Sequence, residues 1–127
     1  MQIAPNFKKS EFDSKDGAPM PDDVLDNVIR LAAALQIIRD HFNAPIKINS
    51  GYRSPAHNAS VGGGVRSQHL KGKAADIVIL VHHPDEVAET IEQLIAEKKI
   101  PQGGLGRYNT FTHYDIRGRR ARWDYRK

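Results

Sequence analysis

The sequence predicts a single α+β domain, with two main helices packed on one face of a small, mainly antiparallel sheet. Two segments repeat apolar residues at the spacing of a helix, and several shorter segments alternate or cluster apolar residues as strands do. A length of 127 residues suits one domain that buries a hydrophobic core without covalent cross-links. The chain has no cysteine, so disulfides and thiolate metal sites are excluded.

Residues 1–20 are predicted to form an irregular N-terminal arm, because prolines and glycine interrupt short polar runs there. Phe7 and Phe12 are the apolar side chains expected to hold this arm against the body of the domain. The rest of residues 1–127 is predicted to form the same domain, with a basic C-terminal segment at 118–127.

The first helix is expected to begin near Asp22 and Asp23, since acidic residues in the first turn favour the helix dipole. Asn43 and the following Ala44-Pro45 step are expected to end it, because a residue before proline avoids the helical region. Between these limits, apolar residues recur at steps of four and three, which indicates one buried stripe: Val24, Val28, Leu31, Leu35, Ile38 and Phe42.

A second helix is expected to open at Pro84, since proline is favoured in the first turn. Its inner stripe consists of Val87, Ile91, Leu94 and Ile95. Strands are predicted from alternation or from β-branched apolar runs, near residues 46–49, 74–81, 104–108, 111–117 and 120–124.

The segment from Ser67 to Asp76 carries the strongest chemical signal in the chain. His69 and Asp76 lie seven residues apart, directly before the apolar run that ends at Val81. An imidazole and a carboxylate together suit Zn²⁺, and a metal explains why an acid stands at the start of a buried strand. A third ligand is needed, and His113 is the best candidate.

Two further residues are candidates for chemistry near such a metal. Arg53 follows a predicted strand, and its planar guanidinium can bind a carboxylate with two parallel hydrogen bonds; a structural ion pair is the alternative. His113 and Asp115 share one face of their predicted strand, about 7 Å apart along it. A carboxylate in that position could accept a proton or orient a ligand.

The net charge of +4 is concentrated at the C-terminus, where arginines crowd the last residues. A basic surface attracts polyanions, either a nucleic acid or an anionic cell wall; a solvated terminus is the alternative. No nucleic-acid motif accompanies the charge, and no segment approaches the roughly 20 apolar residues of a membrane span. We therefore expect neither a nucleic-acid nor a membrane partner.

The motif Ser67-x-His69-x-x-Gly72-x-Ala74-x-Asp76, followed by His113, resembles the zinc peptidases of the D-Ala-D-Ala carboxypeptidase type. This is peptidase family M15, which includes phage L-alanyl-D-glutamate endopeptidases and shares its fold with the hedgehog signalling domain. The upstream Ser-Gly-Tyr-Arg corner that ends at Arg53 matches the family too. Trp123 fits the Arg-Trp ending of a small, phage-like branch.

The resemblance implies one Zn²⁺ held by His69, Asp76 and His113 on the open face of the sheet. It also implies that Arg53 binds a substrate carboxylate or the developing oxyanion, and that Ser67 and Gln68 contact the substrate. The implied activity is hydrolysis of peptide bonds in peptidoglycan through a metal-activated water, either as a D-Ala-D-Ala carboxypeptidase or as an L-Ala-D-Glu-type endopeptidase.

One position departs from the pattern of many relatives. Thr110 stands where they place a catalytic acid three residues before the last histidine, and threonine is no base at neutral pH. Asp115 is predicted to have taken that role. The alternative is a catalytically inactive, zinc-stabilised module for cell-wall binding or virion assembly.

The expected partners are peptidoglycan stem peptides, bound by a monomer. The first residues have no apolar run of signal-peptide length, so we expect synthesis in the cytoplasm without a signal peptide. Action on the cell wall would then follow release through a separately made pore, as for a phage-encoded enzyme.

Overall fold

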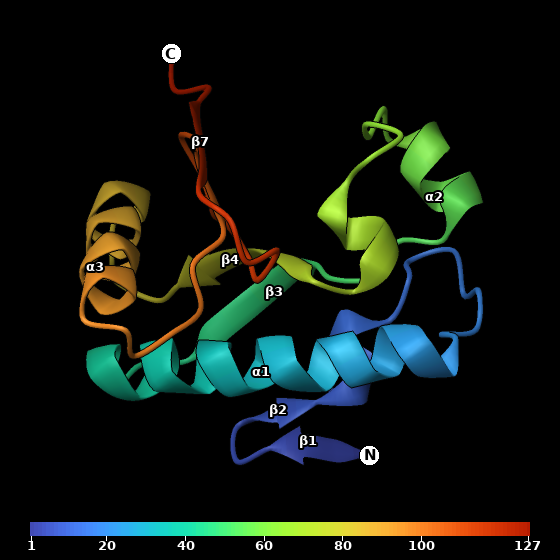
Figure 1. Ribbon diagram of the computed structural model, residues 1–127, viewed down its shortest axis with the longest axis horizontal. Helices are drawn as coiled ribbons and strands as arrows, with labels where there is room; N and C mark the ends of the chain where they lie inside the picture. The colour runs from blue at the N-terminus through green and yellow to red at the C-terminus, as the bar shows by residue number, and fades with distance from the viewer.

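The computed structural model describes all 127 residues and has a main sheet of five strands, in the order β3-β4-β6-β5-β7. Neighbouring strands are antiparallel except β5 and β7, which run parallel. The strands are β3 Ile46–Ser50, β4 Ala74–Ile79, β5 Gly104–Arg107, β6 Thr112–Asp115 and β7 Ala121–Asp124 (Figure 1). The predicted α+β class with a mainly antiparallel sheet is confirmed.

The two main helices are α1, Asp22–Phe42, and α3, Pro84–Ala96, both as predicted. Asn43 adopts a left-handed conformation with φ 49° and ends α1. Both helices contribute their apolar stripes to one core of 24 buried residues, together with side chains of β3, β4, β5 and β6. No helix combines the length and the apolar character needed to cross a membrane.

Alternation along β4 separates this core from the opposite face of the sheet. Ala75, Ile77 and Ile79 point into the core, so Asp76 points to the other face. Asp76 pairs in register with His113 of β6, and His113 pairs on its other side with Gly106 of β5. The register therefore sets two predicted metal ligands side by side on the face that the helices leave open.

The apolar run after Asp76 is longer than the strand that it forms. β4 ends at Ile79, and Leu80 and Val81 are 63% and 89% exposed. Val81 has a φ of 60°, which turns the chain toward α3 and takes both side chains out of the sheet. The prediction of a strand to residue 81 was wrong at this end, because composition does not show where the turn begins.

The N-terminal arm is more regular than predicted. It consists of β1 Gln2–Ala4, β2 Phe7–Lys8 and the short 3₁₀-helix η1 Lys9–Phe12. Phe7 and Phe12 are 1% and 0% exposed, so their predicted anchoring role is confirmed. The carbonyl of Phe12 accepts a hydrogen bond from the Tyr52 N–H at 2.8 Å, and a Cβ on Gly51 would crowd Phe12. The arm thus supports the corner that carries Arg53.

Two short helices lie between β3 and β4. They are α2 Pro55–Ser60 and the 3₁₀-helix η2 Gln68–Lys71. The Ser54 hydroxyl accepts the His57 N–H at 3.1 Å and caps α2, and Pro55 occupies its first turn. Gly62, Gly63 and Gly64 lie between the two helices.

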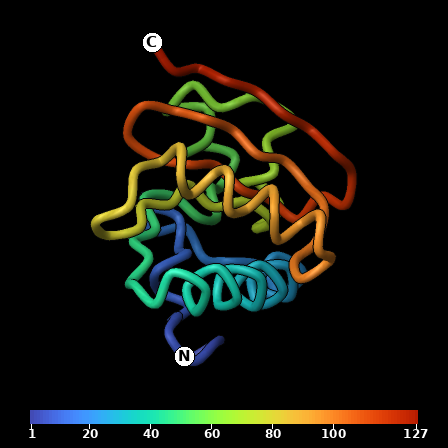
Figure 2. Tube along the Cα trace, turned by 90° about the vertical axis from the view of Figure 1, so that its left-hand side faces the viewer, coloured from blue at the N-terminus to red at the C-terminus, as the bar shows by residue number.

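The C-terminal arginines are largely paired with carboxylates rather than free. Arg122 donates two hydrogen bonds to Glu92 of α3, at 2.8 and 2.7 Å. Arg126 contacts both Asp124 and Asp85. These contacts fasten β7 to the sheet and to α3, and the two chain ends lie on opposite sides of the molecule (Figure 2). The concentrated charge at the C-terminus is therefore partly an internal structural feature.

Candidate metal centre

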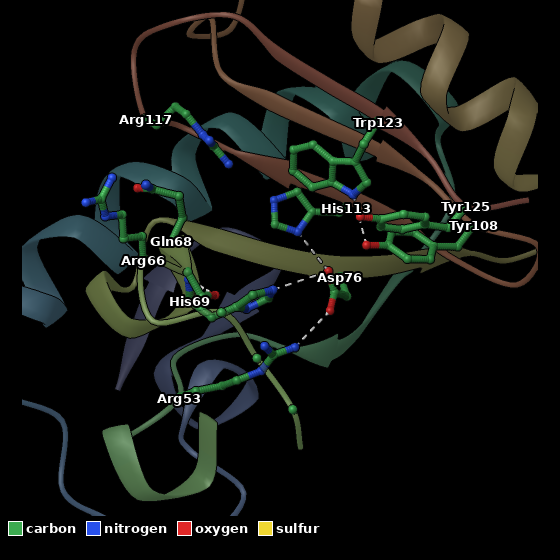
Figure 3. A pocket seen from close by; sticks show the side chains of 14 residues that line it. Arg53, Arg66, Gln68, His69, Asp76, Tyr108, His113, Arg117, Trp123 and Tyr125 are labelled. Carbon is green, nitrogen blue, oxygen red and sulfur yellow. Dashed lines mark hydrogen bonds and ion pairs between the residues drawn. The ribbon is translucent and has the colours of Figure 1, made fainter. Parts of the chain in front are cut away.

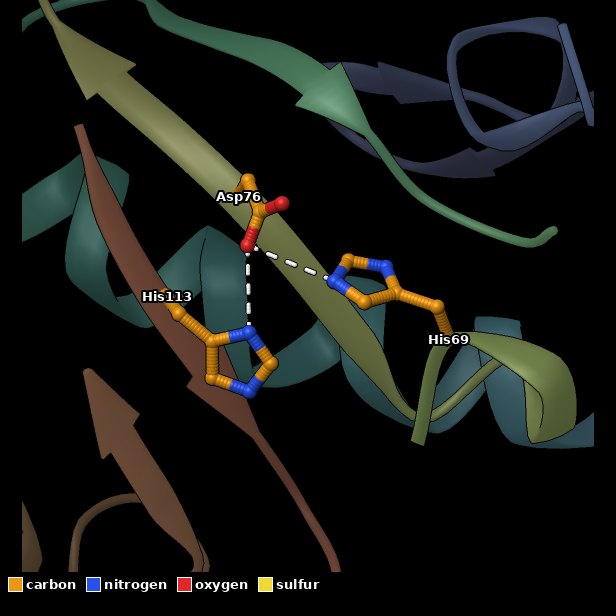
Figure 4. Close-up of side chains that lie close together, drawn as sticks. All are labelled: His69, Asp76 and His113. Carbon is orange, nitrogen blue, oxygen red and sulfur yellow. Dashed lines mark hydrogen bonds and ion pairs between the residues drawn. The ribbon is translucent and has the colours of Figure 1, made fainter. Parts of the chain in front are cut away.

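The three predicted ligands come together from three elements. His69 lies on η2, Asp76 on β4 and His113 on β6, and all three are buried. Asp76 Oδ1 lies 3.3 Å from His69 Nε2 and 3.1 Å from His113 Nδ1 (Figure 4). One donor atom from each residue lies within 4.8 Å of the others, so the group could hold a metal ion.

In each of the two histidine rings, a hydrogen bond at the nitrogen farther from Asp76 leaves the other nitrogen to bind a metal. His69 Nδ1 lies 2.7 Å from the Gly51 carbonyl oxygen, and His113 Nε2 lies 2.7 Å from Asp115 Oδ2. Because both partners are acceptors, each outer nitrogen carries a proton, so the inner nitrogens His69 Nε2 and His113 Nδ1 are the ones that would offer lone pairs to a metal. Without a metal, a proton on an inner nitrogen lets that ring donate to Asp76 instead.

The electrostatics of Asp76 agree with a cation site. Burial alone would raise its pKa, but hydrogen bonds with His113 and His69 hold the pKa of this carboxyl well below its usual range. The carboxylate is therefore ionised at neutral pH. Two imidazole nitrogens and one carboxylate oxygen form a donor set that fits Zn²⁺.

Asp115 lies behind His113 and is fully buried. Besides His113, its carboxylate accepts the Gly104 N–H at 2.8 Å and hydrogen bonds from Arg117 Nε and Nη2 at 2.9 and 2.7 Å. Burial opposes ionisation, but these bonds keep the pKa of Asp115 well below its usual range. A Cβ on Gly104 would collide with this carboxylate, so the glycine makes room for it.

This arrangement does not fit the prediction that Asp115 accepts a proton from water at the metal. The shared face of His113 and Asp115 is confirmed, but the carboxylate is saturated by donors and approaches the ring nitrogen that points away from Asp76. The same hydrogen bonds with Asp115 and Asp76 raise the pKa of His113 above its usual value, although burial would lower it. The geometry is that of a residue that orients a ligand.

Comparison with family models identifies this ligand set. The Peptidase M15 model matches residues 5–115, which include all three ligands. The chain belongs to the peptidase M15 family. No curated protein matches it in sequence. M15 peptidases depend on zinc, and the buried His-Asp-His group of this M15 chain suits that ion.

Arg53 of this M15 domain lies against the ligands. Its Nη2 is 3.4 Å from Asp76 Oδ2, its Nε donates to the Ser50 hydroxyl at 3.1 Å, and its Nη1 donates to Asn58 Oδ1 at 3.3 Å. Asn58 is buried on α2 and donates in turn to the Gly64 carbonyl at 3.0 Å. Sequence reasoning missed Asn58, because an asparagine outside any recognisable motif carries no signal of burial.

The ligands open into a pocket of about 360 Å³, called the metal pocket below (Figure 3). Its lining residues are Arg53, Gly62, Gly63, Gly64, Arg66, Ser67, Gln68, His69, Asp76, Tyr108, His113, Arg117, Trp123 and Tyr125. Asp76 is the one carboxylate among them. Ser67 and Gln68 were predicted to contact substrate, and both line the pocket, although the Ser67 hydroxyl already accepts the His69 N–H at 3.2 Å.

An aromatic group forms one wall of the M15 pocket, and sequence reasoning did not assign it to the site. The Trp123 ring lies 4.8 Å from the His113 ring, and its Nε1 donates to the Tyr108 hydroxyl at 2.9 Å. A Cβ on Gly106 would overlap the indole, so this glycine admits Trp123 to the site. The parallel pairing of β5 with β7 brings these residues together, and that pairing is not visible in the sequence.

Proposed function

We propose that this protein is a zinc-dependent peptidase that hydrolyses peptide bonds in peptidoglycan stem peptides, as a D-Ala-D-Ala carboxypeptidase or an L-Ala-D-Glu-type endopeptidase. The observation that carries the proposal is the ligand set itself. Two imidazoles with fixed tautomers and an ionised Asp76 meet at the base of an arginine-lined pocket. Membership of the M15 family supports both the ion and the substrate class.

The chain's own residues divide the work. Zinc, when bound, would supply a Lewis acid that polarises a carbonyl group and lowers the pKa of water. His69, Asp76 and His113 would hold it, and Asp115 would keep the His113 ring in the required tautomer and orientation. Arg53, which Ser50 and Asn58 hold in position, would bind a substrate carboxylate or stabilise an oxyanion.

Digestion of purified peptidoglycan tests the proposal. Zinc-loaded protein should release new fragments, whose masses identify the bond that is cut. Chelator-treated protein and a His69→Ala variant should release none. Absence of fragments from several wall types with the zinc-loaded protein would reject the peptidase.

One observation favours a second candidate, a zinc-stabilised wall-binding module without turnover. Position 110 is a threonine, and Asp76 is the single carboxylate in the metal pocket, so no separate carboxylate base faces the ligands. The same digestion separates the two candidates, because a binding module would bind peptidoglycan in a zinc-dependent way but release no fragments from it.

A further inference from the structure

Three polar side chains gather along one side of the metal pocket: Arg66, Gln68 and Arg117. In Figure 3 they lie to the left of His113, while Arg53 approaches Asp76 from below. Arg66 follows the glycines at 62–64, Gln68 is the first residue of η2, and Arg117 lies just after β6. None is a metal ligand, and only Arg117 has a role around the ligand set, through its contact with Asp115.

Gln68 gives the first indication of a ligand here. The residue is only 9% exposed, yet its side-chain amide forms no hydrogen bond with protein, while its backbone carbonyl accepts from Gly72 and Lys73. No side-chain nitrogen or oxygen is sealed from solvent without a partner, so this amide opens on the pocket. A mostly buried amide without a protein partner is available to bond a bound molecule.

The two arginines give the second indication, which is guanidinium N–H donors without a protein partner. Arg66 is exposed and takes part in no ion pair or side-chain hydrogen bond. Arg117 directs Nε and Nη2 to Asp115, which fixes the guanidinium and leaves Nη1 without a protein partner. Asp76, the one carboxylate of the pocket, faces the two histidines and Arg53 instead.

We propose that Arg66, Gln68 and Arg117 form a carboxylate subsite, so that the preferred substrate is an acidic peptide with a free carboxylate beside the bond that is cut. The proposal rests on the proposed function and adds a specificity element separate from Arg53. Each of the three supplies N–H donors that suit a carboxylate: the guanidinium of Arg66, Nη1 of Arg117 and the side-chain amide of Gln68. In a stem peptide that carboxylate is either the free α-carboxylate of a γ-linked D-glutamyl residue or the C-terminal carboxylate.

Three forms of one peptide, L-Ala-γ-D-Glu-L-Lys-D-Ala-D-Ala, distinguish these sources: the free acid, the form with only the D-glutamyl carboxylate amidated, and the form with only the C-terminus amidated. For the zinc-loaded wild type, kcat/KM should fall by about tenfold to a hundredfold for the form that lacks the recognised carboxylate, as expected for loss of charge-assisted hydrogen bonds. Equal turnover of all three forms would overturn the subsite while leaving the peptidase intact.

Variants then assign the preference to the subsite. Arg66→Gln and Gln68→Met should reduce the ratio of acid to amide turnover toward one, and Arg66→Lys should restore part of it. Arg119→Gln removes the same charge from an exposed arginine outside the pocket and should keep the wild-type ratio. A uniform loss on all peptides in Arg66→Gln would contradict the proposal.

Calorimetry of the same peptides with zinc-loaded protein separates failure of the subsite from failure of the proposed function. If the wild type cuts none of them but binds the acid form more tightly than one amidated form, and Arg66→Gln loses that difference, the subsite stands without the peptidase. Binding that ignores amidation, or no binding of any form, would reject the subsite.

Discussion

His113 and Asp115 lie two residues apart on β6, and the Nε2 of the histidine is 2.7 Å from the Oδ2 of the aspartate. The other nitrogen of the same ring, Nδ1, is 3.1 Å from Asp76. The ring is thus held between two carboxylates, one that belongs to the candidate metal site and one that does not. Arg117 and the Gly104 N–H fix the outer carboxylate in turn.

Replacing Asp115 by asparagine should therefore weaken zinc binding by about 10- to 100-fold, the usual cost of losing a partner that orients a ligand. The measurement is competition with a fluorescent chelator. Asp124→Asn, at the exposed end of β7, is the matched control and should keep wild-type affinity. A variant that binds zinc normally but no longer cuts peptidoglycan would instead support the proton-accepting role for Asp115.

Zinc itself should stabilise the folded protein, because its ligands meet only when η2, β4 and β6 are assembled. At free zinc a hundredfold above the dissociation constant, the gain in the free energy of unfolding is about 2.7 kcal/mol. Thermal melts with and without chelator measure it. Asp76→Asn should abolish the zinc-dependent increase in Tm, and an undiminished increase in that variant would place the ion elsewhere.

The ligands could be predicted because their constraints are local. His69 and Asp76 both come shortly before one apolar run, and the alternation of side chains already places His113 and Asp115 on one face. Their roles could not be separated in the same way, because residue spacing does not show which carboxylate faces the ion. That depends on the pairing of β6 with β4 and on the donors around Asp115.

Two features of the fold could not be predicted from the sequence: the N-terminal hairpin and the ion pairs of the C-terminal arginines. The stripe of α1 is long enough to be recognised, whereas the hairpin of β1 and β2 is too short for alternation to appear. The basic C-terminus was expected to attract polyanions or to be solvated, but Arg122 and Arg126 find partners on α3, far away in sequence. Charge counts alone do not reveal such partners.

Asn58 should be a stability determinant, since its amide links Arg53 to the Gly64 carbonyl inside the domain. Asn58→Ala leaves both groups without their partner and should cost about 1–3 kcal/mol in the free energy of unfolding, measured with urea. Asn109→Ala removes an exposed asparagine and should change the free energy of unfolding by less than about 0.5 kcal/mol. Similar values for the two variants would show that Asn58 does not hold this corner together.

Asp16 should make the stability of the fold sensitive to acid. Hydrogen bonds from Ser54 and Ser14, at 2.6 and 2.7 Å, lower its pKa from 3.8 to about 2. Since the folded-state pKa is the lower one, the ionised carboxylate stabilises the fold above pH 3.8, and this contribution is lost as the pH falls toward 2. Asp16→Asn should therefore lower Tm at pH 6 and match the wild type near pH 2, as followed by circular dichroism. Asp26→Asn, at an exposed position of α1 without a side-chain partner, is the control and should have the Tm of the wild type at both pH values. A Tm difference between Asp16→Asn and the wild type that is the same at pH 6 and pH 2 would refute the linkage.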